Sequence, residues 1–102
     1  MTPTQRSLKY LRADGWLCAV VEHWNSHARI RQDLFGVVDI LAIRDGETLA
    51  VQTTSTGVSA RVRKIADAEA TPHIRAAGWR FHVHGWRKNA RGRYVLRVVD
   101  VS

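Results

Sequence analysis

The chain has 102 residues, 45% hydrophobic and 25% charged, which suits one folded domain and excludes a disordered chain. It holds no apolar run long enough to cross a membrane, so we expect no membrane partner. The single Cys18 excludes an internal disulfide framework. Together with a first segment unlike a secretion signal, it favours a cytoplasmic protein.

The charge of the chain is unevenly distributed. The net charge is +7, from sixteen Lys and Arg against nine Asp and Glu. Residues 1–60 hold six basic and six acidic side chains, whereas residues 61–102 hold ten basic and three acidic ones. This excess favours a polyanionic partner, most often nucleic acid. The alternative is a basic soluble protein with no such partner.

The first third of the chain predicts one helix and one strand. Thr2 suits the cap and Pro3 the first position of a helix over residues 3–14. Residues 16–21 predict a buried strand. Residues 23–36 are polar, and we expect them to form an irregular loop.

Two runs rich in β-branched residues around Asp45-Gly46 predict a β-hairpin, with strands at 37–43 and 48–54. The remaining elements are predicted, in order, as a helix over 58–70, a short helical turn from Thr71 that stops at Gly78, a strand at 79–84, a basic loop at 85–93 and a strand at 94–101. The strand–helix–strand step predicts a parallel crossover. The expected fold is α/β, a mixed β-sheet flanked by helices in the order αβββα(α)ββ, as one domain.

Three polar residues interrupt the hairpin strands, which otherwise carry side chains typical of a core. A turn centred on Asp45-Gly46 pairs residues whose numbers add to 91, so Asp39 lies opposite Gln52. Because side chains alternate along a strand, Gln52 and Thr54 share a face. We therefore expect Asp39, Gln52 and Thr54 to form one patch.

Two interpretations of this patch are open. A buried carboxylate is unfavourable unless it is paired, and a metal ion would offset the lost hydration. The Asp39 carboxylate and the Gln52 carbonyl are oxygen ligands of the kind that Mg²⁺ prefers, and Glu22 and Asp33 are placed to add carboxylates. Alternatively, Asp39 and Gln52 only hydrogen-bond to each other at a strand end.

The segment VVDILAIRDGETLAVQTTS, residues 37–55, resembles the core of the PD-(D/E)XK nucleases, especially the Holliday-junction-resolvase-like members. Their core has the order αβββαβ. An Asp on the second strand is followed, on the third, by an acid, one further residue and a Lys. Asp39 matches the Asp, whereas Gln52 and Thr54 stand at the acid and Lys positions. The resemblance covers about residues 3–84.

This resemblance implies a restriction-endonuclease-like sheet and a small DNA endonuclease that uses Mg²⁺ or Mn²⁺, acts on branched DNA and forms a homodimer, with a phage as its origin. Gln52 removes one charge from the family's metal site, which Glu22 would restore. Thr54 cannot supply the lysine's cation. In some members that lysine lies on the following helix, which makes Lys64 or Arg61 the candidate here.

The implied catalytic residues are Asp39, Gln52, Thr54 and Lys64. Two alternatives stand beside the nuclease. The first is a catalytically inactive nucleic-acid-binding module on the same fold. The second is an unrelated RNA-binding or protein-interaction domain, which predicts an antiparallel sheet without the crossover.

Basic residues in three segments are candidates for phosphate contacts. They lie in the loop before the second hairpin strand, at the start of the long helix and in the basic loop near Trp86. Each group has a plain alternative, a solvated charged surface. The candidates are Arg29, Arg31, Arg61, Arg63, Lys64, Arg87, Lys88 and Arg91.

Overall fold

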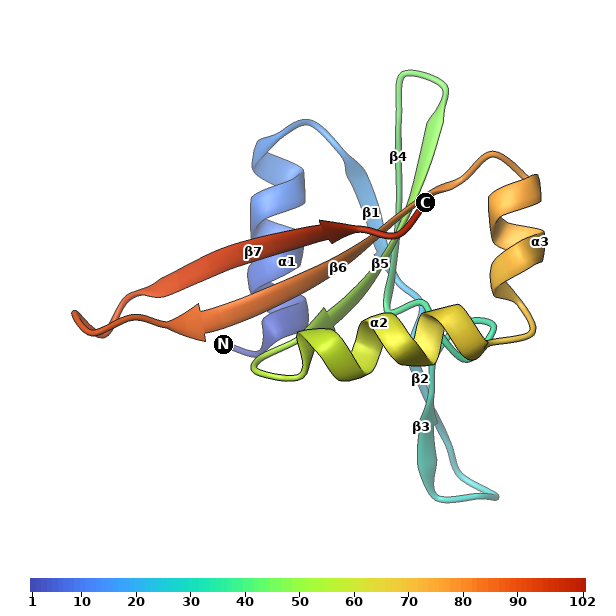
Figure 1. The fold of residues 1–102 in the computed structure, drawn as a ribbon, viewed down its shortest axis with the longest axis horizontal. Coiled ribbons are helices and arrows are strands. Elements are labelled where there is room, and N and C mark those ends of the chain that lie inside the picture. The colour runs from blue at the N-terminus through green and yellow to red at the C-terminus, as the bar shows by residue number, and fades with distance from the viewer.

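The computed structural model describes residues 1–102 and has a five-stranded mixed sheet at its centre (Figure 1). The sheet order is β1-β4-β5-β6-β7, and only β5 and β6 pair in parallel. The elements are α1 (Pro3–Ala13), β1 (Leu17–Val20), β2 (His23–Asn25), β3 (Ile30–Gln32), β4 (Ile40–Arg44), β5 (Glu47–Thr54), α2 (Val58–Asp67), α3 (Thr71–Ala76), β6 (Arg80–Lys88) and β7 (Tyr94–Asp100). The predicted α/β class and mixed sheet are confirmed.

The first helix begins at the predicted cap. The Thr2 hydroxyl accepts a hydrogen bond from the Gln5 backbone N–H at 3.1 Å, and the Gln5 side chain accepts one from the Thr2 N–H at 2.8 Å. These reciprocal bonds satisfy two donors that the first turn leaves free.

None of the three helices combines the length and apolarity needed to cross a membrane.

The β4–β5 hairpin has the predicted register. Ile40 pairs with Val51 and Arg44 with Glu47. Asp45 and Gly46 form the turn with positive φ angles of 50° and 79°, which the twist of a two-residue hairpin favours. The ladder ends at the Ile40–Val51 pair, and the Asp39 N–H donates to the Val51 carbonyl at 2.9 Å. The Asp39 and Gln52 side chains still meet, through their own hydrogen bond.

The connection from β5 to β6 runs through α2 and α3 and returns parallel, as predicted. α2 ends at Asp67 rather than at residue 70, because the backbone is extended at Ala68, φ −74° and ψ 138°. The parallel β5–β6 pair argues against the alternative of an unrelated RNA-binding or protein-interaction domain, which predicts a purely antiparallel sheet.

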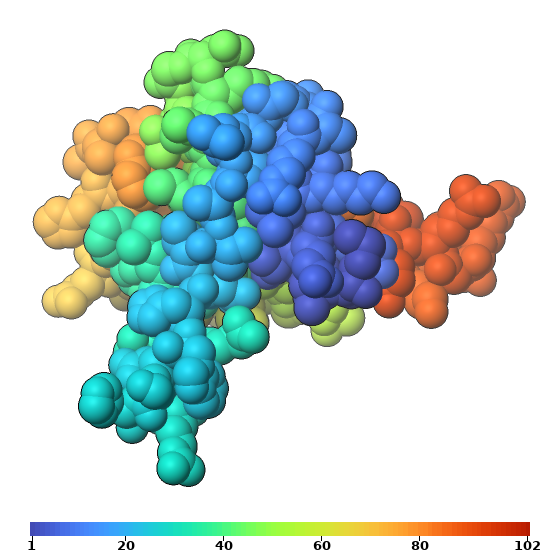
Figure 2. All heavy atoms as spheres, turned by 180° about the vertical axis from the view of Figure 1, so that it is seen from behind, coloured from blue at the N-terminus to red at the C-terminus, as the bar shows by residue number.

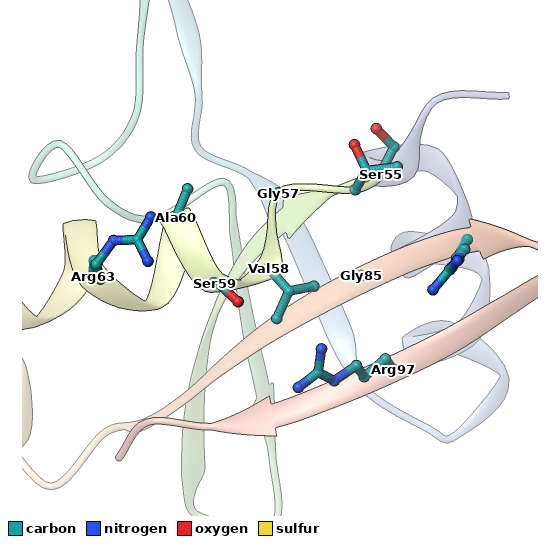
Figure 3. A pocket seen from close by; sticks show the side chains of 10 residues that line it. Ser55, Gly57, Val58, Ser59, Ala60, Arg63, Gly85 and Arg97 are labelled. Atoms are coloured by element: carbon teal, nitrogen blue, oxygen red, sulfur yellow. The ribbon is translucent and has the colours of Figure 1, made fainter.

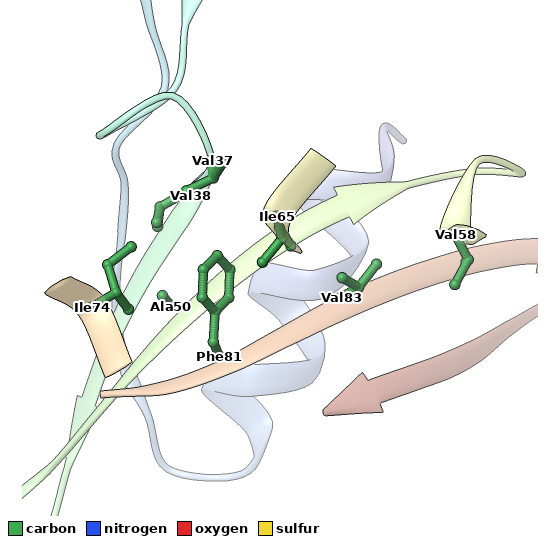
Figure 4. Close-up of a cluster of buried hydrophobic side chains, with 8 residues drawn as sticks. All are labelled: Val37, Val38, Ala50, Val58, Ile65, Ile74, Phe81 and Val83. Carbon is green, nitrogen blue, oxygen red and sulfur yellow. The ribbon is translucent and has the colours of Figure 1, made fainter. Parts of the chain in front are cut away.

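Two apolar clusters cover the two faces of the sheet. α2 and α3 pack with Ala50, Phe81 and Val83 on one face (Figure 4). α1 packs with Leu49 and Val51 on the other face. Because successive residues of β5 point to opposite faces, this central strand is buried on both sides.

Residues 23–36 are not an irregular loop, which corrects the sequence prediction. β2 and β3 form a second hairpin, with His23 opposite Gln32. Figures 1 and 2 show it projecting from the body of the molecule. The hairpin packs on no other element, so polar residues suit both of its faces. The sequence therefore shows no alternation of polar and apolar residues there.

Two strand boundaries and the burial of one strand also differ from prediction. β4 begins at Ile40, because residues 35–37 turn and Leu34 bridges to Val38. β1 is not buried: it is an edge strand, and Leu17 is 70% exposed because α2 and α3 do not reach its face, whereas Cys18 packs against the cluster beside α1. Residues 85–88 are not loop, because β6 continues to Lys88 and pairs there with β7.

Candidate metal centre and nucleic-acid interface

Three carboxylates meet where β1, β3 and β4 come together. Glu22 lies just after β1, Asp33 just after β3 and Asp39 just before β4. One carboxylate oxygen of each lies within 4.8 Å of the others. Oxygen ligands at this spacing form a cluster that can hold a metal ion.

The Asp39 side chain points toward Gln52, as the hairpin register predicts. Gln52 Nε2 donates a 2.6 Å hydrogen bond to Asp39 Oδ2 and a 3.3 Å hydrogen bond to Asp33 Oδ2. Asp39 and Gln52 are 4% and 1% exposed. Gln52 therefore bridges two members of the carboxylate cluster.

Thr53 also binds Asp39, which the sequence does not predict. Its backbone N–H donates to Asp39 Oδ2 at 2.8 Å, and its hydroxyl donates to the same oxygen at 3.2 Å. Strand alternation places the Thr53 side chain on the other face from Gln52, so no periodic pattern indicates this contact.

The surroundings of Asp39 make it a weaker acid than an ordinary aspartic acid. Burial raises its pKa to about 7, the hydrogen bond from the Thr53 backbone opposes this shift, and the neighbouring Asp33 adds to it. The charged form of Asp39 is therefore disfavoured near neutral pH. A cation among these oxygens would reverse that preference.

Basic side chains surround the carboxylates. Lys64 Nζ of α2 lies 3.5 Å from Asp33 Oδ2, and Arg31 Nη1 of β3 lies 3.6 Å from Glu22 Oε1. Arg61, one turn before Lys64 on α2, lines the same cavity as the carboxylates. The structure thus brings the predicted Lys64 and Arg61 to the site.

The cluster forms a wall of an open cavity of about 310 Å³. All but one of its lining residues carry a polar side chain. They are Pro3, Glu22, Asp33, Asp39, Gln52, Thr53, Thr54, Ser55 and Arg61. A phosphate group can reach the carboxylates through such an opening.

The Gln52 amide presents its nitrogen to the carboxylates and leaves its oxygen without a partner. Gln52 Oε1 is buried and has no hydrogen-bond partner, whereas Nε2 bonds the carboxylates. Rotating the amide by 180° would turn Oε1 toward Asp39, which is favourable with a cation among the oxygens or with a protonated Asp39 that donates its O–H to Oε1. Three carboxylates and one amide carbonyl form a donor set for a hard cation.

The other predicted residues lie in several places. Thr54 lines the cavity, and its hydroxyl accepts a 3.1 Å hydrogen bond from the Gly57 N–H just before α2. Arg29 lies in the turn between β2 and β3. Lys88 and Arg91 lie at the tip of the β6–β7 hairpin, which projects on another side of the molecule (Figure 2).

No family model and no curated protein matches the chain.

Proposed function

We propose that the protein is a small cytoplasmic endonuclease of the PD-(D/E)XK kind, which hydrolyses phosphodiester bonds of DNA with Mg²⁺ or Mn²⁺. The observation that carries the proposal is the cluster of Glu22, Asp33 and Asp39 in an open polar cavity, beside the unpartnered carbonyl of Gln52. The parallel crossover supports it, because it supplies the strand–helix–strand step of the αβββαβ core that the resemblance implies.

The chain supplies four oxygen ligands and two cations. Glu22, Asp33 and Asp39 would hold the metal with Gln52 Oε1. A bound divalent cation supplies positive charge to the phosphate and lowers the pKa of water.

Lys64 would leave Asp33 for a phosphate oxygen and, with Arg61, stabilise the negative charge of the transition state. The Thr54 hydroxyl would orient the attacking water or a phosphate oxygen.

The basic residues outside the cavity would hold the strand on either side of the cut. Arg29 and Arg31 belong to the β2–β3 hairpin, and Lys88 and Arg91 to the β6–β7 hairpin. Both hairpins project from the sheet, so they can reach separate parts of a duplex or the arms of a branched substrate. Contacts from such residues go to phosphates and make binding sensitive to salt.

A specific observation favours a second candidate, a nucleic-acid-binding module without catalysis. The Gln52 amide nitrogen, not its oxygen, faces Asp39 and Asp33. It gives these carboxylates a partner other than a metal, and the residue at the lysine position is Thr54. In this candidate the same basic surfaces bind DNA, and the acidic cluster is structural.

A cleavage assay on linear and branched DNA with Mn²⁺ separates the two candidates. The test variant is Asp39→Asn, and the matched control is Asp45→Asn, which makes the same change in an exposed turn where Asn suits the positive φ angle. We expect the wild type and the control to cleave DNA. The cleavage rate of Asp39→Asn should be lower by at least about 100-fold. DNA binding with no Mn²⁺-dependent cleavage would select the binding module.

A further inference from the structure

A second cavity, of about 570 Å³, lies between the start of α2 and the strands β6 and β7 (Figure 3). Residues 55–60 form one wall, and Arg63 of α2 lies one turn further along. Gly85 and Arg87 of β6 and Arg97 of β7 form the opposite side. No acidic residue lines this cavity.

The three arginines of this cavity have no protein partner. Arg63, Arg87 and Arg97 make no side-chain hydrogen bond and no ion pair, whereas Arg31, Arg44 and Arg80 each pair with a carboxylate. Figure 3 shows Arg63 and Arg97 coming from different elements around the cavity. Three unpaired guanidinium groups without a neighbouring acid form a site for an anion, and the planar fork of a guanidinium matches phosphate.

Donors other than arginine line the same space. Ser55, Thr56 and Ser59 contribute hydroxyl groups. No side chain caps the start of α2, so backbone N–H groups of its first turn remain free to bind an anion. Gly85 permits this arrangement, because a Cβ there would lie 2.4 Å from Val58 Cγ2.

The arginine cavity adjoins the carboxylate cavity. Ser55 lines both of them, and α2 presents Arg61 to the carboxylate cavity and Arg63 to the arginine cavity. One strand of nucleic acid can therefore pass from one cavity to the other across the residues that lead into α2.

We infer that the arginine cavity binds a phosphate group of the nucleic-acid strand whose scissile phosphate lies at the carboxylates. The inference deepens the proposed function and rests on it for the nature of the ligand. The phosphate is either an internal phosphodiester or a terminal 5′-phosphate, since the same guanidinium groups bind both. Arg97, which the sequence pattern does not indicate, is part of this site.

The test measures binding of a fluorescent single-stranded oligonucleotide by anisotropy, in EDTA so that no cleavage occurs. The test protein is the double variant Arg63→Ala/Arg97→Ala. The matched control is Lys9→Ala/Arg12→Ala, which removes two exposed charges from α1, away from both cavities. Each protein binds the same sequence with a 5′-phosphate and with a 5′-hydroxyl, over a range of salt concentrations.

We expect the cavity variant to bind at least tenfold more weakly than the control variant, with its salt slope reduced by about 1. Weakening confined to the 5′-phosphorylated oligonucleotide identifies a terminal phosphate, and equal weakening on both identifies an internal one. If the cavity variant and the control variant lose the same affinity, the inference is overturned.

The outcome is separable from that of the proposed nuclease. Asp39→Asn should keep the arginine-dependent binding in EDTA while it loses cleavage. If the wild type never cleaves but the cavity variant still loses affinity, the nuclease proposal fails and the phosphate site stands. If the wild type cleaves and the cavity variant binds like the control, the phosphate site fails alone.

Discussion

Gln52 Nε2 lies 2.6 Å from Asp39 Oδ2, across the open end of the β4–β5 hairpin. The same carboxylate oxygen accepts the Thr53 backbone N–H, yet burial and Asp33 still raise the Asp39 pKa to about 7. The hydrogen bonds that Gln52 and Thr53 donate therefore do not offset the negative charge of the carboxylate cluster. A divalent cation would do so, and Gln52 Oε1 would become a further ligand once the amide turned by 180°.

Asp39 should make the protein less stable as the pH rises. Its pKa is about 7 in the fold against 3.8 for a free aspartate, so the fold binds a proton that the unfolded chain has lost. The free energy of unfolding from this group falls between pH 4 and pH 7 and is constant above pH 7. Chemical denaturation should show Asp39→Asn more stable than wild type at pH 8, by a few kcal/mol, and nearly equal at pH 4.

The titration of His84 changes the stability in the opposite direction and must be separated from that of Asp39. Burial lowers the pKa of His84 to about 4, so its contribution is lost as the pH falls from 6.5 toward 4. Both proteins carry His84, so its effect cancels in their difference. A difference that is the same at pH 4 and pH 8 would contradict the account of Asp39.

Gln52→Glu should strengthen metal binding. It restores the acid that the nuclease pattern places there and adds a fourth carboxylate to the cluster. Without metal, the melting temperature at pH 8 should fall, because another buried charge lacks a partner. With Mg²⁺, it should rise by more than that of wild type, since binding to the folded state stabilises it. The control Gln5→Glu, in an exposed helix cap, should respond to Mg²⁺ like wild type.

Lys64→Ala should reduce turnover without unfolding the protein. The lysine side chain is 43% exposed and its ion pair with Asp33 spans 3.5 Å, so the pair adds less than about 1 kcal/mol to stability. Removing a cation that stabilises transition-state charge lowers kcat by about 100-fold. Single-turnover cleavage by Lys64→Ala and by the control Lys9→Ala tests this, and an unchanged kcat would exclude Lys64 from catalysis.

Gly85→Ala should displace the start of α2 from β6. The new Cβ would lie 2.4 Å from Val58 Cγ2, and overpacking of this kind costs about 1–3 kcal/mol. Thermal melting measures the loss. Adding Val58→Ala removes the opposing methyl group, so the double variant should lose less than the sum of the two single changes. Additive losses would mean that the two residues do not clash.

The sequence predicts what local rules determine. The Thr2 cap, the Asp-Gly turn and the register of the β4–β5 hairpin are local. The turn and the register bring the Asp39 and Gln52 side chains within hydrogen-bond distance. It also identifies Glu22 and Asp33 as candidate ligands, and the structure brings both to Asp39.

The sequence does not predict features that depend on packing between distant segments of the chain. The exposure of β1 follows from where α2 and α3 lie, which its own apolar residues do not reveal. The β2–β3 hairpin lacks an apolar face, so no alternation marks it. Thr53 binds Asp39 mainly through its backbone, which residue type does not encode, and Arg97 reaches its cavity only because β7 pairs with β6.

Calorimetric titration of the metal-free protein with Mn²⁺ at pH 8 tests the carboxylate cluster most directly. We expect a saturable binding heat in wild type and in Asp45→Asn, its loss in Asp39→Asn, and release of a proton on binding at pH 6, where Asp39 is still protonated in the free protein. Binding heat that survives in Asp39→Asn, or none in wild type, would contradict the account.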